Sequence, residues 1–276
     1  MKINSNRLRH LYISPLEQCN LNCQICYTRK TKERLTKEEI LRFVKNYSKK
    51  IKLQTITFCG GEVFILPWFI DLVNELTPKY YVQIITNGTI DNLEKIEKPE
   101  AINLIVSIDG IPEYHESNRG KGIWKKCIEF IKHGMSLGMK AEVFSIITKE
   151  NFGKIAEFKK ELGIDIPITF HPRKPMNYLK NHPVSNRVGK VEGFGFISEL
   201  ERQKLEKKEN VFPPTKFGCY QIALMSDGMV YGCCEGIKPL GGMDKSVNRL
   251  IGELVNRLEK ARIACQEPEF RCGMEE

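Results

Sequence analysis

Short apolar runs alternate with longer amphipathic stretches from residue 8 to residue 172. The short runs are rich in β-branched and aromatic residues, and the longer stretches repeat their apolar positions with a helical period. This alternation is typical of consecutive βα units, which build a parallel sheet covered by helices. The predicted strands span residues 8–14, 53–58, 81–86, 102–108, 141–148 and 166–171. We therefore predict an α/β fold with six βα units.

Sequence signals mark the ends of the predicted helices. Thr36 and Glu39 form a capping box ahead of an apolar run. Pro67 suits the first turn of the next helix, and Gly138 stands where a left-handed C-cap belongs. Asn151 is expected to cap the helix that precedes the sixth strand.

The alternation stops after the sixth strand. Residues 172–194 are rich in Pro, Asn, Lys and Gly, and residues 197–210 indicate a highly charged helix. Pro213 and Pro214 open a tail of different composition. The predicted parts are a domain of βα units over residues 1–175, a linker and bridging helix over 176–212, and a small C-terminal domain over 213–276.

The composition is that of a folded protein. Apolar residues make up 41% and charged residues 28% of the 276 residues, which excludes a disordered or collagen-like chain. The sequence has no long apolar run and no secretory signal, so we expect a cytoplasmic protein without a membrane partner.

The net charge of +9 is unevenly placed along the chain. Residues 28–52 hold ten Lys and Arg against three Glu, a net of +7. A solvated helix face and its preceding loop explain this excess, and attraction of an acidic peptide, a phosphate or nucleic acid is the alternative. Charge alone does not predict a nucleic-acid partner, and we do not expect one.

The ten cysteines fall into two groups, with two cysteines outside them. The first group is Cys19, Cys23 and Cys26, the second is Cys219, Cys233, Cys234, Cys265 and Cys272, and Cys59 and Cys127 stand apart. In a reducing cytosol such thiols serve as metal ligands, nucleophiles or core residues rather than as disulfides. Cys127 lies on the apolar face of a predicted helix, so we expect it to pack in the core.

The first group places three thiols within eight residues, directly after the first predicted strand. A structural zinc site needs four closed ligands, and no histidine lies close in sequence to complete one here. A four-iron cluster held by three cysteines leaves one iron open to another ligand. The trio by itself predicts such a cluster, with zinc completed from elsewhere or metal-free thiols as alternatives.

Further motifs follow the predicted strands in order. The quoted segments are Cys19-Asn20-Leu21-Asn22-Cys23-Gln24-Ile25-Cys26-Tyr27, Cys59-Gly60-Gly61-Glu62, Thr86-Asn87-Gly88, Ser107-Ile108-Asp109-Gly110, Tyr114-His115 and Arg119-Gly120. Together they resemble the radical S-adenosylmethionine (radical SAM) superfamily. The resemblance implies a partial (β/α)6 barrel and a 4Fe-4S cluster with an open iron on Cys19, Cys23 and Cys26.

The resemblance also implies an activity. The reaction is reductive cleavage of S-adenosylmethionine to a 5′-deoxyadenosyl radical, which abstracts a hydrogen atom from a substrate. Such a radical SAM oxidoreductase would oxidise, epimerise or cross-link a peptide or a small metabolite. A flavodoxin- or ferredoxin-type protein would supply the electron.

Several residues are cofactor contacts by resemblance. They are Tyr27 beside the adenine, the backbone of Gly60, Gly61 and Glu62 at the amine, Ser107 and Arg119 at the carboxylate or ribose, and Asn87, Asp109 and Thr148. Gly60 and Gly61 are expected to let the backbone approach the ligand closely. The alternatives are that Glu62 and Asp109 cap turns, and that Arg119 lies on the surface. Thr148, His171 and Arg173 are candidates for substrate contact, with a wall position as the alternative for His171.

The tail resembles the SPASM/Twitch extension of radical SAM enzymes. Cys219, Gly228 and Cys233 follow its spacing around a predicted hairpin, although the first interval is one residue short. Cys265 and Cys272 would complete four ligands for an auxiliary 4Fe-4S cluster in a small C-terminal Twitch-like Fe-S domain. A zinc site on the same four thiols is the alternative.

Cys234 and Glu235 are the candidate catalytic residues of the tail. In related peptide-oxidising maturases an aspartate follows the hairpin cysteine, whereas this chain has Cys234 there and Glu235 next. The sequence leaves three alternatives open for Cys234, which are a cluster ligand, a hydrogen-atom donor to a substrate radical and a packing residue.

Two other classes of protein remain as alternatives. A non-catalytic iron–sulfur electron carrier or sensor would use the three cysteines without a cofactor pocket, against which Gly60, Gly61, Glu62, Ser107 and Arg119 argue. A zinc-dependent nucleic-acid binder would explain the basic stretch but not the βα loops. Only 18 residues precede Cys19, so we expect no separate leader-peptide-binding domain there.

Overall fold

The computed structural model describes residues 5–26, 28, 30–174, 191–212, 221–236 and 238–261. Its strands are β1 (His10–Ile13), β2 (Thr55–Phe58), β3 (Tyr81–Thr86), β4 (Ile102–Ser107), β5 (Lys140–Ile147), β6 (Ile168–Pro172), β7 (Asn210–Val211), β8 (Ile222–Leu224), β9 (Met229–Tyr231) and β10 (Gly241–Gly242). They form one sheet in the order β10-β9-β8-β1-β2-β3-β4-β5-β6-β7. All six predicted strands are present at their predicted places.

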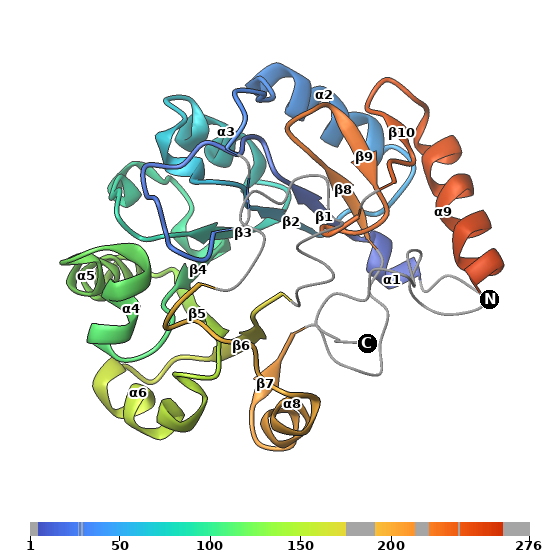
Figure 1. Cartoon of the computed structure of the whole chain (residues 1–276). Coiled ribbons are helices and arrows are strands. Elements are labelled where there is room, and N and C mark those ends of the chain that lie inside the picture. Colours follow the sequence, from blue (N-terminus) through green and yellow to red (C-terminus); the bar gives the residue numbers. More distant parts are fainter. Residues whose placement is uncertain are drawn as a thin grey trace.

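The sheet is mostly parallel and does not close. Every neighbouring pair from β8 through β1 to β7 is parallel, while β9 and β10 pair antiparallel. The strands follow an arc, and α2 to α6 lie on its outer side (Figure 1). The predicted partial barrel is therefore confirmed.

The helices mostly follow the strands that the βα pattern pairs them with. Their bounds are α1 (Ser5–Leu8), α2 (Lys37–Ser48), α3 (Phe69–Leu76), α4 (Pro112–Arg119), α5 (Ile123–Ser136), α6 (Ile155–Leu162), α8 (Glu199–Glu206) and α9 (Val247–Ala261). Short 3-10 turns lie at η1 (Val63–Ile65), η2 (Leu93–Lys95), η3 (Pro99–Ala101) and η4 (Phe152–Lys154). No helix in these described ranges is long and apolar enough to cross a membrane.

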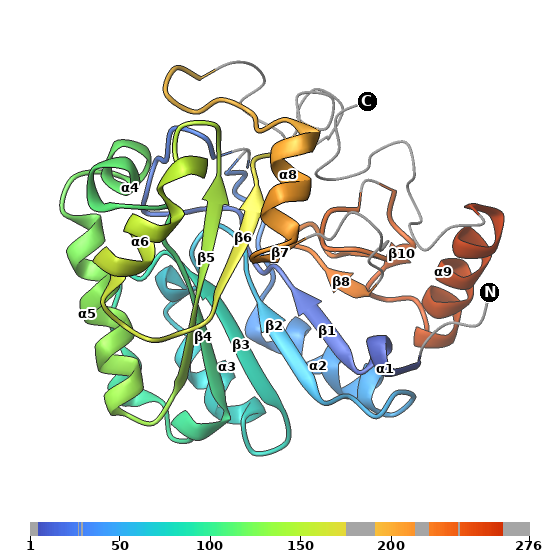
Figure 2. The ribbon, with the colours of Figure 1, turned by 90° about the horizontal axis from the view of Figure 1, so that it is seen from below.

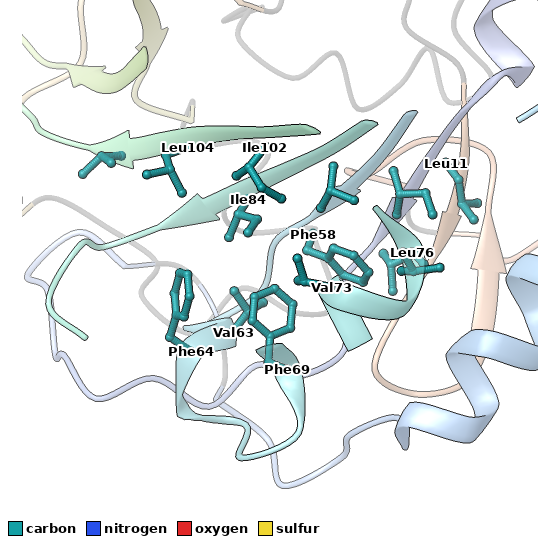
Figure 3. Close-up of a cluster of buried hydrophobic side chains, with 14 of the residues drawn as sticks. Leu11, Phe58, Val63, Phe64, Phe69, Val73, Leu76, Ile84, Ile102 and Leu104 are labelled. Carbon is teal, nitrogen blue, oxygen red and sulfur yellow. The ribbon is translucent and has the colours of Figure 1, made fainter. Parts of the chain in front are cut away.

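The main core lies between the outer face of the sheet and the helices. Figure 3 shows Leu11, Phe58, Ile84 and Leu104 on the strands facing α3 and the preceding turn. The Phe58 and Phe69 rings meet edge to face at 5.4 Å. Each such fully buried aromatic ring stabilises the fold by about 2 kcal/mol through removal of apolar surface from water.

The opposite face of the sheet is polar and forms the inside of the barrel. His10 on β1, Thr57 on β2 and Gln83 on β3 are joined by hydrogen bonds of 2.6 and 2.7 Å. The same alternation of side chains that buries Ile84 under the helices therefore turns its neighbours inward. The barrel interior can accept polar ligands.

The helix-end predictions are partly confirmed. Thr36 and Glu39 make the capping box of α2, and Gly138 has a φ of 95° just after α5. Pro67 is not in the first turn of α3, because that helix begins at Phe69. Asn151 does not cap α6, because its side chain binds Thr148, Asp109 and Ile146 instead.

The tail joins the same sheet. β8 pairs in parallel with β1, and β9 returns after a turn at Gly228, which has a φ of 74°. The charged helix forms as α8, with a capping box between Ser198 and Glu201 (Figure 2). The division into three parts stays a prediction, and residues 175–190, 213–220 and 262–276 lie outside the described ranges.

Candidate active site

The sequence motifs gather at one edge of the sheet. The carboxyl ends of parallel strands meet at a single edge, which is where barrels of this class place their sites. The loops after β1, β2, β3 and β4 carry Cys19, Gly60, Asn87 and Asp109 respectively. In Figure 2 this edge lies where the arrowheads of β5 and β6 point.

The double glycine holds the start of the cysteine loop, defined here as residues 15–26. Gly61 N–H donates to Leu16 O at 3.0 Å, and Glu62 N–H donates to Gln18 O at 3.0 Å. A Cβ on Gly61 would stand 2.0 Å from Gln18 O, and one on Gly60 2.3 Å from Leu16 O. The close approach that these glycines allow here is to the cysteine loop, and their approach to a ligand stays a prediction.

Glu62 ties two neighbouring loops together. Its carboxylate is 1% exposed and accepts from Phe64 N–H, Thr86 Oγ1–H and Asn87 N–H, the last at 2.8 Å. Burial raises the pKa of Glu62, and these donors oppose the shift. Glu62 caps the turn η1, which is the alternative that the sequence left open, and it also fixes the loop after β3.

Asn87 reaches the first cysteine from that loop. Its Nδ2 group lies 3.5 Å from Cys19 Sγ and 2.9 Å from Asn20 Oδ1. Leu21 N–H donates to the same sulfur at 3.4 Å. Burial raises the pKa of Cys19, and N–H donors of this kind favour the thiolate that a metal needs.

Asp109 and Arg119 form a buried ion pair on the other side of the loop. Arg119 Nε lies 2.6 Å from Asp109 Oδ2, and Nη2 lies 3.0 Å from Oδ1. Burial alone would raise the pKa of Asp109, but the Arg119 guanidinium outweighs it and the pKa is lowered. The surface reading of Arg119 is wrong, since its side chain is 10% exposed. Its charge also opposes the rise that burial gives the pKa of Cys23.

Ser107 and Thr148 lie at the ends of neighbouring strands. Ser107 is half-buried at the end of β4 and lies opposite Phe144 in the sheet. Thr148 is fully buried, and its hydroxyl is hydrogen-bonded to Tyr114 OH. Thr148 directly follows β5, and its hydroxyl is bound inside the protein.

The inner wall near β6 carries a further polar group. His171 packs between the rings of Phe144 and Phe212, with centroids 4.4 and 5.4 Å away. Its Nε2 atom is buried and has no hydrogen-bond partner among the described residues. Burial, helped by the charge of Lys174, lowers the pKa of His171 to about 3, so the ring is neutral.

The tail reaches this wall. Lys174 Nζ lies 3.0 Å from Glu235 Oε1, in an ion pair that joins the end of β6 to the segment after β9. Cys233 is buried and accepts from Glu235 N–H at 3.4 Å, while Cys234 beside it is half-buried. The negative charge of Glu235 also contributes to the raised pKa of Cys59, whose largest cause is burial. Glu235 therefore stands between the ends of β2 and β6.

The side chain of Arg173 contacts residues 194 and 196. Its guanidinium lies over the Phe196 ring at 4.5 Å and donates to Phe194 O. Cys127 is fully buried, as predicted, and donates to Asn87 O at 3.2 Å. Tyr27, Cys219, Cys265 and Cys272 lie outside the described residues.

The cysteine trio, Cys19, Cys23 and Cys26, supplies the thiol ligands of this edge. Within the described ranges, the one group of three ligand atoms lying within 4.8 Å of one another is Asp91, Glu94 and His133, of which both carboxylate residues are exposed. Cys19, Cys23 and Cys26 do not form such a group, so their sulfurs do not all lie within 4.8 Å of one another, whereas tetrahedral zinc would bring thiolates to about 3.8 Å. A four-iron cluster is a larger body and holds its thiolates further apart. Three thiols, with N–H donors at Cys19 Sγ, are the type of ligand that such a cluster takes.

The sequence reasoning missed Asn118, which holds the cysteine loop from α4. Its backbone oxygen accepts from Gln24 N–H at 2.9 Å. The residue directly precedes Arg119, so the motif itself pointed to this helix end. The contact is invisible in the sequence, because 94 positions separate Asn118 from Gln24.

The chain matches the sequence profile of a known protein family. The profile described as the radical SAM superfamily matches residues 13–162, more than half of the chain. A GTP 3',8-cyclase of Microcystis aeruginosa is 25% identical over 198 residues, which cover 66% of this chain and 58% of that protein. The putative peptide biosynthesis protein YydG of Bacillus subtilis is 26% identical over 236 residues, covering 79% of this chain and 66% of that protein.

Solved structures share the fold. Native anSMEcpe with bound AdoMet and Cp18Cys peptide has a TM-score of 0.70 at 19% identity, covering 90% of this chain and 81% of that one. Streptococcus suis SuiB bound to the precursor peptide SuiA has a TM-score of 0.58 at 15% identity, covering 86% and 63%. At these identities the likeness concerns the fold alone.

Proposed function

The chain belongs to the radical SAM superfamily, and from this premise we propose that it cleaves S-adenosylmethionine reductively and abstracts a hydrogen atom from a peptide substrate. The observation that carries the proposal is the cysteine loop, whose three thiols are held between the loops after β2 and β3 and the helix α4. When bound, the cluster and S-adenosylmethionine supply the electron transfer and the 5′-deoxyadenosyl radical. The protein supplies binding, orientation and shielding from water.

Cys19, Cys23 and Cys26 hold the cluster in this proposal. The amine of S-adenosylmethionine is a donor, so it would bind backbone carbonyls of Gly60, Gly61 and Glu62, while the N–H groups of Gly61 and Glu62 donate to the cysteine loop. Nε and Nη2 of Arg119 are bound to Asp109, which leaves Nη1 for the carboxylate or ribose. Ser107 stands at the neighbouring strand end.

A peptide is the substrate class that the comparisons favour. Two proteins of similar fold are named with a bound peptide, and YydG is named for peptide biosynthesis. At the wall near β6 the Lys174–Glu235 ion pair, beside the buried ring of His171, has a donor and an acceptor of the kind that a peptide amide needs. A small metabolite is the alternative, since GTP 3',8-cyclases are also relatives.

The tail completes the proposal. Cys219, Cys233, Cys265 and Cys272 would hold the auxiliary 4Fe-4S cluster, and Cys234 and Glu235 would act on the substrate near it. Cys233 and Glu235 lie at the inner wall of the barrel, which supports a role beside the substrate. A flavodoxin- or ferredoxin-type protein would deliver the electron.

The test is formation of 5′-deoxyadenosine. Protein reconstituted anaerobically and reduced with dithionite should release 5′-deoxyadenosine from S-adenosylmethionine, measured by liquid chromatography and mass spectrometry. Cys23→Ala should abolish the product, because it removes one of three ligands. Cys127→Ala, which removes a buried thiol outside the trio, should retain it. A fully reconstituted wild type that forms no product would instead be an electron carrier.

A further inference from the structure

Asn118, near the end of α4, makes three hydrogen bonds that bear on the cysteine loop. Resting on the proposed function, we propose that Asn118 is a positioning residue, which fixes the backbone between the second and third cluster ligands. It acts by holding the peptide units that carry Cys23 and Cys26.

Two consecutive peptide groups of the loop bind to Asn118. Gln24 N–H donates to its backbone oxygen at 2.9 Å, and Ile25 N–H donates to its side-chain Oδ1 at 3.2 Å. Both donors lie between Cys23 and Cys26, which are further joined by a Cys26 N–H bond to Cys23 O at 3.3 Å. Helix α4 therefore holds the segment of the loop that carries two of the three thiols.

The side chain of Asn118 is itself fixed. It is 2% exposed, and its Nδ2 group donates to Asp109 Oδ2 at 2.7 Å. Asp109 is held in turn by Arg119 and by Ile146 N–H on β5, and its carbonyl accepts from Asn151. This chain of bonds connects the cysteine loop to the rigid sheet rather than to α4 alone.

A side-chain amide meets both demands at this position. Ile25 N–H needs an acceptor and Asp109 needs a donor, and an asparagine offers one of each. An aspartate would keep the acceptor but place a second carboxylate against Asp109. A leucine of similar size would leave the buried Ile25 N–H unpaired and remove one of the donors that hold Asp109, and a buried group without its partner is costly.

The arrangement separates the two ends of the loop. Asn87 donates to the sulfur of Cys19, whereas Asn118 holds the peptides next to Cys23 and Cys26. Loss of Asn118 should therefore loosen two ligands while the first keeps its own donors. Outer contacts of this kind typically change metal affinity about 10- to 100-fold.

The experiment uses the full chain with reconstituted clusters. Asn118→Leu and Asn118→Asp are compared with wild type and with Ser117→Ala, whose exposed hydroxyl binds only Tyr114 O on the same helix. The first readout is the rate at which iron is lost to a chelator under anaerobic conditions. The second is the change that S-adenosylmethionine causes in the electron paramagnetic resonance spectrum of the reduced protein, which reports on a cluster with an open iron.

Asn118→Leu should lose the iron of the open cluster about 10- to 100-fold faster than wild type and show a smaller spectral response to S-adenosylmethionine. Asn118→Asp should lie in between, and Ser117→Ala should match wild type. Circular dichroism identifies a variant that fails to fold. If Asn118→Leu does not fold, Asn118→Asp decides by the same two readouts.

Wild-type rates and spectra in a folded Asn118 variant would overturn the inference and leave the proposed function intact. Equal effects in Ser117→Ala would also overturn it, because they would assign the change to α4 in general. Failure of the proposed function has a different signature, since the wild type itself would then show no spectral response to S-adenosylmethionine.

Discussion

The edge of the barrel that carries the cysteine loop and the tail hairpin that leads to Cys233 and Cys234 are held in different ways. The cysteine loop has almost no regular secondary structure, and hydrogen bonds from residues far along the chain position it. The hairpin of β8 and β9 is held by regular pairing, with β8 in register with β1 from Leu11 to Ile13. One region depends on particular side chains and glycines, the other on backbone pairing.

This contrast has an energetic consequence. Backbone pairing tolerates many side chains, because each residue contributes the same N–H and C=O groups. The cysteine loop instead relies on buried polar residues such as Glu62 and Asp109, and a buried polar group that loses its partner is costly. Single substitutions should therefore be much more damaging at the edge than in the hairpin.

The largest expected effect tests the edge directly. Gly61→Ala places a Cβ 2.0 Å from Gln18 O, so the start of the cysteine loop must move. We expect a loss of about 3 kcal/mol in the free energy of unfolding and poor incorporation of the first cluster. Denaturant unfolding and iron analysis measure the two effects.

Gly153→Ala is the matched control for that variant. Gly153 is exposed in the turn η4 and has no atom within 4 Å of an added Cβ. The control should retain wild-type stability and iron. Wild-type iron content in Gly61→Ala would contradict the view that the glycines serve the loop.

An intermediate effect on the free energy of unfolding is expected at acid pH from His171 in the barrel wall. The folded pKa of His171 is lowered to about 3, whereas an unfolded histidine titrates near 6.5. As the pH falls below about 6.5, the unfolded chain takes up a proton that the folded chain does not, so stability falls. At pH 5 the loss from this residue is about 2 kcal/mol.

His171→Gln should therefore lose less stability between pH 7 and pH 5 than wild type, by denaturant unfolding at both values. Ile168→Val on the same strand removes apolar atoms but no titrating group, so its deficit should be equal at both pH values. An unchanged pH dependence in His171→Gln would show that this ring is accessible to protons in the folded state.

The smallest effect is expected in the hairpin. Gly228 has a φ of 74°, but a Cβ there would meet only Met243 Sδ at 3.7 Å. Gly228→Ala should cost about 1 kcal/mol from the left-handed backbone alone and leave the iron content unchanged. A loss as large as that of Gly61→Ala would remove the distinction between the two regions.

Much of the fold was predictable, because it depends on local patterns. The six strands follow from short apolar runs, and the capping box of Thr36 and Glu39 involves residues three positions apart. The fate of Asn151 was not predictable, since its partners Asp109 and Ile146 come from other βα units. Pro67 was misplaced by two residues because helix starts shift with tertiary packing.

The candidate site was predictable in its members but not in their partners. The motifs located the cysteines, Glu62, Asp109 and Arg119 at one edge. They did not predict that Asp109 would bind Arg119, or that Gly61 would face Gln18. Asn118 escaped notice because its loop contact joins two distant segments.

The order of strands and helices and the identity of the three thiols were thus determined by the sequence, since hydrophobic period and cysteine spacing are local properties. Only the tertiary structure decided which polar groups form hydrogen bonds within the protein and which remain for a ligand. The physical reason is that a buried hydrogen bond needs both partners in contact, and folding brings them together from loops that are separated by tens of residues.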